Sequence, residues 1–209
     1  MNRSFSRRIG KTLSSLQKNL LESELPKYLF KVDNCANYQD IFLEIGFGMG
    51  EHFIHQMKLN PNALFIGVEA YLNGVANVLK LAKQENITNF MLWPDDLDLI
   101  IKDLPENCLS NIYILFPDPW LKRKQQKKRI INKERLDILA AKLKKKGTLI
   151  FASDIVNYFN ASKELMVQNG FSIVNKNFTV PHFGYITTKF HHKANLVGRK
   201  VYFLEATII

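Results

Sequence analysis

The sequence has 209 residues, with 29 Lys and Arg against 19 Asp and Glu and a formal net charge of +10. That length is enough for one domain with its own hydrophobic core. The basic excess indicates a polyanionic partner, either nucleic acid or a membrane surface. The two cysteines are far apart, which excludes a disulfide framework and a cysteine-based zinc site. No apolar run approaches the length of a membrane span.

The start of the chain is basic and contains no acid before Glu22. Its cations are Arg3, Arg7, Arg8, Lys11 and Lys18. This composition fits a mitochondrial transit peptide, a basic arm that contacts phosphates, or a disordered start. It has no apolar segment of the kind that directs secretion. Leucines at helical spacing then predict a short amphipathic helix that stops near Pro26.

A glycine-rich loop between a strand and a helix is the centre of the sequence. Residues Ile41–Ile45 predict a strand buried on both faces of a parallel sheet. Three glycines follow at alternate positions: Gly46, Gly48 and Gly50. A dinucleotide-binding loop would need its third glycine at the position of Glu51. The pattern E-x-G-x-G-x-G that begins at Glu44 instead resembles motif I of the class I S-adenosylmethionine-dependent methyltransferases.

Acidic residues follow the next two predicted strands. The strand over residues 63–68 ends at Glu69, where an acid can bind ribose hydroxyls in a doubly wound sheet; a strand-end acid facing water is the alternative. A helix with apolar residues from Val75 to Ala82 comes next. The strand over residues 90–93 leads to Asp95 and Asp96, either of which could reach the donor's adenine or cap a helix. We take Asp96 as the donor contact.

The segment Pro117-Asp118-Pro119-Trp120 directly follows a predicted strand over residues 111–116. Its two prolines fix φ on both sides of the acid and remove two backbone donors. The sequence therefore predicts a rigidly presented Asp118 carboxylate beside an aromatic ring. Many amine methyltransferases have an Asn- or Asp-Pro-Pro-aromatic loop at this point, whereas Trp120 replaces the second of those prolines here.

Two lysine-rich segments come next and are interpreted differently. Residues 122–129 contain six cations, and their place after the Asp118 loop favours phosphate contacts over a solvated charge run. Lys142 and Lys144–Lys146 precede Gly147 at the end of a predicted helix. The helix dipole and a glycine cap explain those lysines without a function.

The remainder predicts a strand over residues 148–152, a helix to about Asn169, and then strands only. These last strands are expected near residues 172–177, 185–191 and 200–207, with no helix between the last two. The expected architecture is thus a parallel sheet finished by a hairpin. The three histidines of this region, His182, His191 and His192, lack the spacing of a metal site.

These motifs together resemble those of the bacterial tRNA (guanine-N7-)-methyltransferases. The resemblance extends over essentially the whole chain, including the basic start at residues 3–13 and the segments 188–190 and 203–206. It implies transfer of a methyl group from S-adenosylmethionine to N7 of a variable-loop guanosine of tRNA (m7G46). The implied donor contacts are Glu44, Gly46, Gly48, Gly50, Glu69, Asp96 and Asp118, with Asp118 also catalytic. The implied contacts to the guanosine are Lys122, Asp154, Thr188, Lys189, Phe190 and His191.

The same resemblance implies the architecture and setting of the protein. The fold expected is α/β, a doubly wound, mainly parallel seven-stranded sheet with a C-terminal antiparallel hairpin, of the Rossmann-like class I methyltransferase type. Residues 1–209 would be a single domain with a basic N-terminal arm and helix (about 1–35). The enzyme would be cytoplasmic, a monomer or homodimer, and would need tRNA but no membrane and no metal.

Two positions depart from the family pattern. Leu121 stands where the family usually has a further proline, so the loop has one fewer rigid residue. His191 stands where the family usually has glutamate. Protonated histidine offers no acceptor and would oppose a cation on the purine. We therefore hypothesise that activity falls as the pH drops below about 6.5.

The implied chemistry agrees with the residues present. Guanine N7 carries an in-plane lone pair and no proton, so its attack on a methyl group needs no general base. A fixed carboxylate such as Asp118 would stabilise the cationic purine. Two alternatives stay open at this point: a methyltransferase acting on an exocyclic amine of RNA or DNA, and a non-catalytic RNA-binding module on the same fold.

Overall fold

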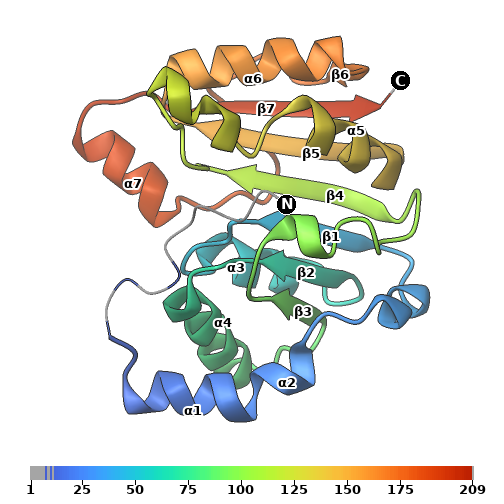
Figure 1. The fold of residues 1–209 in the computed structure, drawn as a ribbon, viewed down its shortest axis with the longest axis vertical. Helices are drawn as coiled ribbons and strands as arrows, with labels where there is room; N and C mark the ends of the chain where they lie inside the picture. Colours follow the sequence, from blue (N-terminus) through green and yellow to red (C-terminus); the bar gives the residue numbers. More distant parts are fainter. Residues whose placement is uncertain (1–7, 9, 11, 209) are drawn as a thin grey trace. The chain divides into compact units, whose positions relative to one another are not determined.

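The computed structural model of the chain describes residues 8, 10 and 12–208, which divide into two compact units at Pro105 and Glu106 (Figure 1). The first unit contains α1 (Ser15–Ser23), α2 (Leu25–Tyr28), η1 (Val32–Asn37), β1 (Ile41–Ile45), α3 (Glu51–Leu59), β2 (Leu64–Val68), α4 (Leu72–Gln84), β3 (Phe90–Trp93) and η2 (Leu97–Leu99). The second contains β4 (Leu109–Leu115), η3 (Arg123–Lys128), α5 (Lys133–Lys142), β5 (Leu143–Ser153), α6 (Val156–Gln168), β6 (Phe171–Ile173), α7 (Lys189–Leu196) and β7 (Tyr202–Ile208).

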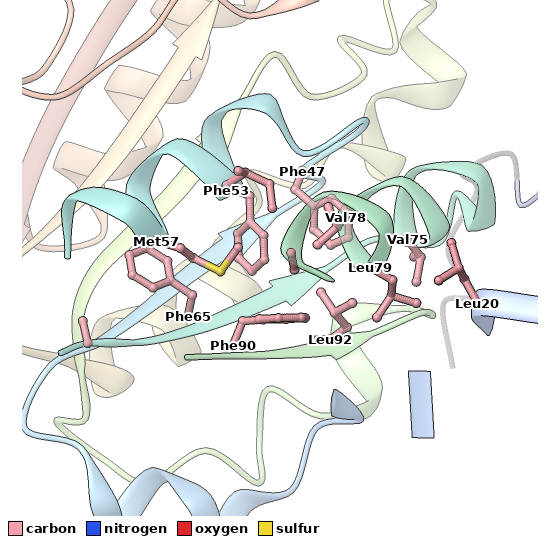
Figure 2. Packing of buried hydrophobic residues seen from close by; sticks show 13 residues of the cluster. Leu20, Phe47, Phe53, Met57, Phe65, Val75, Val78, Leu79, Phe90 and Leu92 are labelled. Carbon is pink, nitrogen blue, oxygen red and sulfur yellow. The ribbon is translucent and has the colours of Figure 1, made fainter. Parts of the chain in front are cut away.

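In the first unit the strands run parallel in the order β3-β2-β1. The fully buried β2 lies in the middle, as expected for a continuous apolar run in a parallel sheet. Side chains from α3 and α4 point toward those of β2 and β3 and form one buried cluster with them (Figure 2). Phe53 and Met57 of α3 and Val75, Val78 and Leu79 of α4 carry most of the helical side of this cluster.

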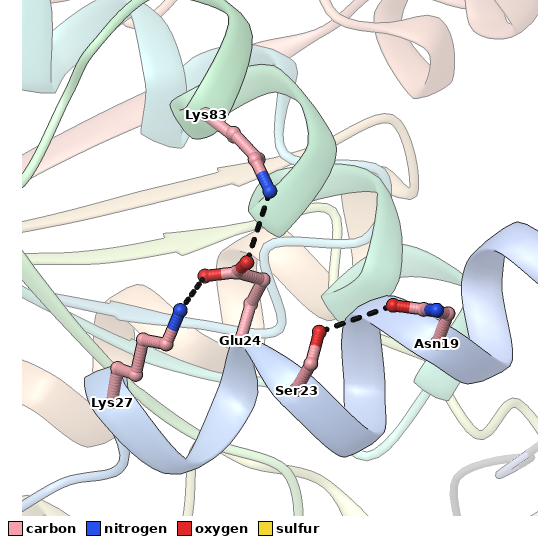
Figure 3. A network of polar contacts seen from close by, with 5 residues as sticks. All are labelled: Asn19, Ser23, Glu24, Lys27 and Lys83. Carbon is pink, nitrogen blue, oxygen red and sulfur yellow. Dashed lines mark hydrogen bonds and ion pairs between the residues drawn. The ribbon is translucent and has the colours of Figure 1, made fainter.

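The predicted N-terminal helix is present as α1, and it packs against α4. Ser14 and Gln17 form a capping box at its start. At its end, Glu24 accepts from Lys27 (2.8 Å) and from Lys83 of α4 (3.0 Å), as Figure 3 shows. Both hydrogen bonds lower the pKa of Glu24, and the one from Lys27 has the larger effect. These exposed lysines thus lie at the polar edge of the packing between α1 and α4.

In the second unit β4 and β5 are parallel, whereas β7 runs antiparallel to both β5 and β6, in the order β4-β5-β7-β6. Phe151 of β5 is fully buried, and its ring meets that of Tyr158 edge-on at 5.5 Å between centroids. The predicted mainly parallel strands with a C-terminal antiparallel pair are confirmed. No helix of the residues described here is long and apolar enough to cross a membrane.

One strand prediction is wrong. Residues 185–191 are not a strand: residues 189–196 form α7, and Thr188 is its N-cap, accepting a hydrogen bond from the backbone N–H of His191 (3.3 Å). A threonine at the N-cap satisfies one of the unpaired donors of the first helical turn. In place of the predicted strand over residues 185–191, β7 pairs with β5 on one side and with β6 on the other. The strand β6 is shorter than the predicted strand over residues 172–177.

The helix that was expected to continue to Lys146 ends at Lys142. Leu143 is extended and pairs with Leu109 of β4, so Lys144–Lys146 lie in β5, beside a shift in strand register. Lys146 has φ of 71°, as occurs in a β-bulge. Gly147 is therefore not a helix cap. A Cβ there would lie 2.9 Å from the Leu109 carbonyl oxygen, so close strand packing requires the glycine.

Candidate active site

The glycine loop of the first unit joins β1 to α3 in the predicted manner. Gly46 has φ of 77° and donates to the Val68 carbonyl (2.8 Å), and Gly50 has φ of 84° and is the N-cap of α3. The loop lies directly on α4: a Cβ on Gly50 would come within 2.2 Å of Val78, and one on Gly74 within 1.9 Å of the Gly48 carbonyl oxygen. Glycine is thus required on both sides of this contact.

Glu69 holds this loop through the backbone. Its Oε2 accepts from the Gly48 N–H (2.8 Å) and its Oε1 from the Tyr71 N–H at the start of α4 (2.9 Å). Glu69 thus joins the glycine loop to the start of α4. Its predicted contact with ribose hydroxyls stays a prediction.

Glu44 is buried in β1, and a hydrogen bond joins its Oε2 to Nδ1 of the equally buried His52 in α3 (2.8 Å). Sequence reasoning missed His52. Its position in the first turn of α3 was the available signal, because that turn faces the end of the preceding strand. The carboxylate is thus fixed by a side chain from the helix that follows the glycine loop.

Two acids follow β3, as predicted, and they make different contacts. Asp96 is nearly buried and caps η2, with its Oδ1 accepting from the Asp98 N–H (3.0 Å). Asp95 accepts from the Asp96 N–H (2.8 Å) and pairs with Arg8 (3.3 Å). The choice of Asp96 over Asp95 as a donor contact stays a prediction.

The described part of the basic start lies on the first unit. The Arg8 carbonyl accepts from the Leu72 N–H (2.8 Å), and the Gly10 N–H donates to Asn73 Oδ1 (3.2 Å), both at the start of α4. Asn77 of the same helix donates to the Met49 carbonyl of the glycine loop (2.8 Å). Arg3, Arg7 and Lys11 lie outside the described residues.

The predicted proline loop follows β4 in the second unit. Phe116 continues the pairing of β4 with β5 by donating to the Ala152 carbonyl (2.9 Å), yet its φ is 52°. Trp120, at the other end of the loop, has φ of 42°. Bulky residues with positive φ are strained and persist only where neighbouring contacts hold them. Asp118 therefore lies in a segment with strained backbone at both ends.

The basic segment after this loop divides into two groups of cations. Lys128 lies over the Trp120 ring (4.8 Å), and Arg129 donates from Nε to the Pro119 carbonyl (2.9 Å). The other cations are exposed: Lys122, Arg123, Lys124 and Lys127. Of the six cations, only these four exposed side chains could make the predicted phosphate contacts without a change in the described structure.

The remaining predicted substrate residues lie at the end of β5 and the start of α7. Asp154 pairs with Arg199 (2.9 Å). Thr188 is buried as the N-cap of α7, whereas Lys189 and Phe190 are exposed on its first turn. The Phe190 ring stacks on that of Phe116, with 6.4 Å between centroids.

His191 lies inside an aromatic group instead of on a strand. Its Nδ1 is 2.9 Å from the Tyr185 hydroxyl, and its ring centroid is 6.1 Å from that of Phe116 and 5.9 Å from that of Phe203. Burial lowers the pKa of His191. The ring is therefore neutral near neutral pH, and Nδ1 can accept from the Tyr185 hydroxyl. His191 thus contacts the residue that precedes Pro117.

No group of three or more His, Cys, Asp or Glu among residues 8, 10 and 12–208 has the arrangement of a metal site. The titratable groups described above make hydrogen bonds and ion pairs within the protein. Such an arrangement can hold a polar ligand and stabilise charge.

Comparison with known proteins places the chain in a family. The family model described as "Putative methyltransferase" matches residues 38–204. A "Bifunctional methyltransferase" of Rickettsia conorii is 61% identical over 98% of this chain but only 40% of its own length. The chain thus spans about two fifths of that relative. A tRNA (guanine-N(7)-)-methyltransferase of Azorhizobium caulinodans is 37% identical over 93% of this chain and 90% of its own length.

The fold also agrees with solved structures. An "antibiotic related Methyltransferase" superposes with a TM-score of 0.62 at 17% identity, over 95% of this chain and 97% of the other. The predicted seven-stranded, mainly parallel α/β fold of the class I methyltransferases is confirmed. From the sequence matches, the chain belongs to the tRNA (guanine-N7-)-methyltransferase family.

Proposed function

We propose that this chain transfers a methyl group from S-adenosylmethionine to N7 of a guanosine in the variable loop of tRNA (m7G46). The observation that carries the proposal is the segment after β4: Asp118 lies between two prolines, and exposed cations follow at once in η3. A fixed carboxylate suits a reaction that creates a cationic base. The adjacent cations suit a phosphate backbone.

The first unit would hold the methyl donor. The backbone at Gly46 is open, because a Cβ there would meet no described atom within 4 Å. Glu69 is fixed to bind ribose hydroxyls, Asp96 would contact the adenine, and Gly48, Gly50 and the buried Glu44 shape the loop beneath the ligand. When bound, the donor supplies an electrophilic methyl group on a sulfonium. These residues therefore have a binding and orienting role.

The second unit would act on the guanosine. N7 would form its bond to the methyl carbon as the carbon–sulfur bond of the donor breaks and S-adenosylhomocysteine leaves, and no proton would have to leave the base. Positioning alone can contribute about 7–11 kcal/mol to such a step. Asp118 stabilises the positive charge that develops on the purine. Its role is electrostatic, so it neither takes nor gives a proton.

The guanine edge would be recognised by residues near Asp154. A carboxylate can accept from both N1–H and the N2 amino group of guanine, and the ion pair with Arg199 holds Asp154 for that contact. Lys122 and Lys189 would contact phosphates. Thr188, Phe190 and His191 would shape the start of α7 around the base. Of these, Phe190 is exposed enough to contact a ligand directly.

Incubation of the protein with unmodified tRNA and labelled donor, followed by mapping of the methylated nucleoside, tests this proposal. We expect N7-methylguanosine at one position of the variable loop. Methylation of an exocyclic amine would support the alternative enzyme class. Donor binding with no methyl transfer to any RNA would support the RNA-binding module.

Further parts of the proposal concern organisation and location. We propose a cytoplasmic enzyme, because that is where its tRNA substrate is found. Residues 1–209 would act as one domain with the basic N-terminal arm and helix (about 1–35), as a monomer or a homodimer. Light scattering with and without tRNA measures the oligomeric state.

A further inference from the structure

The last cation of the basic segment, Arg129, contacts the proline loop and not only solvent. Its Nε donates to the Pro119 carbonyl at 2.9 Å, and its guanidinium carbon lies 4.6 Å from the centroid of the Tyr158 ring. Tyr158 belongs to α6 and is only 1% exposed, so it is a fixed surface for the guanidinium. A cation over an aromatic face is attracted by the ring's quadrupole.

The backbone of Arg129 is itself held in place. Its N–H donates to the Gln126 carbonyl (3.0 Å), and its carbonyl accepts from Asn132 (3.2 Å) and Arg135 (3.4 Å). Asn132 is in turn the N-cap of α5, where it accepts from the Arg135 N–H (3.0 Å). Arg129 thus joins the start of one helix to the ring of another.

Asp118 belongs to the same electrostatic group. Burial has the largest effect on the pKa of the Tyr158 phenol and raises it; the Ile131 backbone and the Arg129 charge lower this pKa, and the Asp118 carboxylate raises it by the smallest amount. The acid and the cation therefore act on the same buried ring.

The loop needs such support. Pro119 has no N–H, so its carbonyl is the only backbone hydrogen-bonding group through which it can be held. The next residue, Trp120, has φ of 42° and requires neighbouring contacts to stay there. A hydrogen bond to the Pro119 carbonyl fixes the peptide plane between these two residues. Because the pyrrolidine ring fixes φ at Pro119, holding this plane also restricts the backbone that carries the preceding Asp118.

We propose that Arg129 is a positioning residue for Asp118: its guanidinium lies on the Tyr158 ring and holds the Pro119 carbonyl instead of contacting tRNA phosphates. This inference rests on the proposed methyl transfer for its kinetic consequence but not for its structural one. It assigns one of the six cations to ordering the loop and leaves the exposed group of Lys122, Arg123, Lys124 and Lys127 to bind RNA. The phosphate contacts predicted for the cations of residues 122–129 therefore do not include Arg129.

The substitution Arg129→Lys separates the two roles. Lysine keeps the charge but cannot lie flat on a ring and donate sideways to a carbonyl as the planar guanidinium does. A misplacement of about 1 Å in an active site can cost on the order of 100-fold. We therefore expect Arg129→Lys to lower kcat by on the order of 10- to 100-fold, with the tRNA Kd and its salt dependence unchanged. The matched control is Lys133→Ala, which removes a nearby exposed cation paired with Asp137 and should leave kcat unchanged.

Tyr158 provides a second kinetic test. The variant Tyr158→Phe keeps the aromatic face and should keep kcat within a few-fold. Wild-type kcat in Arg129→Lys would overturn the inference. So would an Arg129→Ala variant whose salt slope for tRNA binding falls by about 0.7–0.9 of a log–log unit, because that decrease is the signature of one phosphate contact.

A measurement without turnover separates failure of this inference from failure of the proposed function. The sequence has two tryptophans, Trp93 and Trp120, so labelling with 5-fluorotryptophan gives two ¹⁹F resonances, which Trp120→Phe assigns. Arg129→Lys should shift and narrow the Trp120 resonance as the loop gains mobility, while the Trp93 resonance reports an intact first unit. An unchanged Trp120 resonance would overturn the inference whether or not the wild type methylates tRNA. Absence of N7-methylguanosine in the wild type would instead overturn the proposed function.

Discussion

The two regions that carry the candidate site are held by different kinds of contact. The glycine loop is fixed by hydrogen bonds of its backbone to the side chains of Glu69 and Asn77 and by close packing, because the Gly48 carbonyl leaves no room for a side chain at Gly74. The proline loop is held chiefly by a guanidinium and an aromatic ring: Arg129 donates to the Pro119 carbonyl, and the Phe190 ring stacks on that of Phe116. The difference suggests that the first region tolerates little change in shape, whereas the second can be altered one side chain at a time.

The largest effect is expected for Asp118→Asn. A neutral amide cannot stabilise the cationic purine, so kcat should fall by roughly 100-fold or more, while donor affinity changes by less than the rate. Steady-state kinetics and calorimetry measure the two quantities. Asp137→Asn, an exposed acid on α5 paired with Lys133, is the matched control. Turnover near the wild-type value would remove Asp118 from catalysis.

Gly74→Ala tests the backbone contact of the first region. An alanine in a helix usually stabilises relative to glycine by about 1 kcal/mol. Here the added Cβ would lie 1.9 Å from the Gly48 carbonyl oxygen, and such overpacking costs about 1–3 kcal/mol. Urea unfolding should therefore show a less stable protein, with weakened donor binding. Lys80→Ala, on the exposed face of the same helix, is the control. A more stable Gly74→Ala variant would show that the loop moves freely away from α4.

Glu69→Ala removes the acceptor that joins the loop to α4 and should weaken donor binding. A hydrogen bond to a charged group contributes about 1.5–3 kcal/mol, so a loss on the order of tenfold or more in donor affinity is expected. Affinity for tRNA should stay nearly constant. Separate titrations of the two ligands measure this, and an equal loss of both would indicate misfolding.

The exposed cations of the second region should act through phosphates. Replacing Arg123, Lys124 and Lys127 by alanine should weaken tRNA binding and flatten its salt dependence by about 0.7–0.9 of a log–log unit for each phosphate that is no longer neutralised. The triple replacement of Lys144, Lys145 and Lys146 in β5 removes the same charge and is the control. A salt slope of the Arg123, Lys124 and Lys127 variant equal to that of the wild type would assign this segment to the solvated surface.

The smallest effect concerns His191. Burial lowers its pKa in the folded protein, whereas the unfolded chain keeps a value of about 6.5. Between these two values the unfolded chain binds more protons, so stability contributed by this group is lost as the pH falls below about 6.5. The Tm of wild type should fall relative to that of His191→Phe over this range and run parallel to it above. Parallel curves throughout would show that His191 is not desolvated.

The local part of this structure was predictable from the sequence. The strand at Ile41–Ile45, the glycine loop and the strand ending before Glu69 are each specified by residues next to one another. His52 was missed because its partner, Glu44, belongs to a different element. The same holds for Asn77, whose side chain binds the glycine loop from α4.

The less predictable part depends on contacts between distant residues. Thr188 is a standard N-cap, but the sequence analysis predicted a strand over residues 185–191 and did not use this signal, so α7 was missed. Lys144–Lys146 have good helix propensity, but pairing of Leu143 with Leu109 draws them into β5. The hydrogen bond between Arg129 and Pro119 has no local signature either. Neighbouring cations look alike in the sequence, and their contacts differ only when the chain folds.

The most direct test of the account changes one atom of the substrate. A tRNA carrying 7-deazaguanosine at the variable-loop acceptor position has a C–H group in place of N7 and is otherwise unaltered. The account predicts that this tRNA binds with the affinity of the unmodified transcript and receives no methyl group from the labelled donor. Methyl transfer to the 7-deaza tRNA at the rate seen with the unmodified transcript would show that the chain modifies another atom.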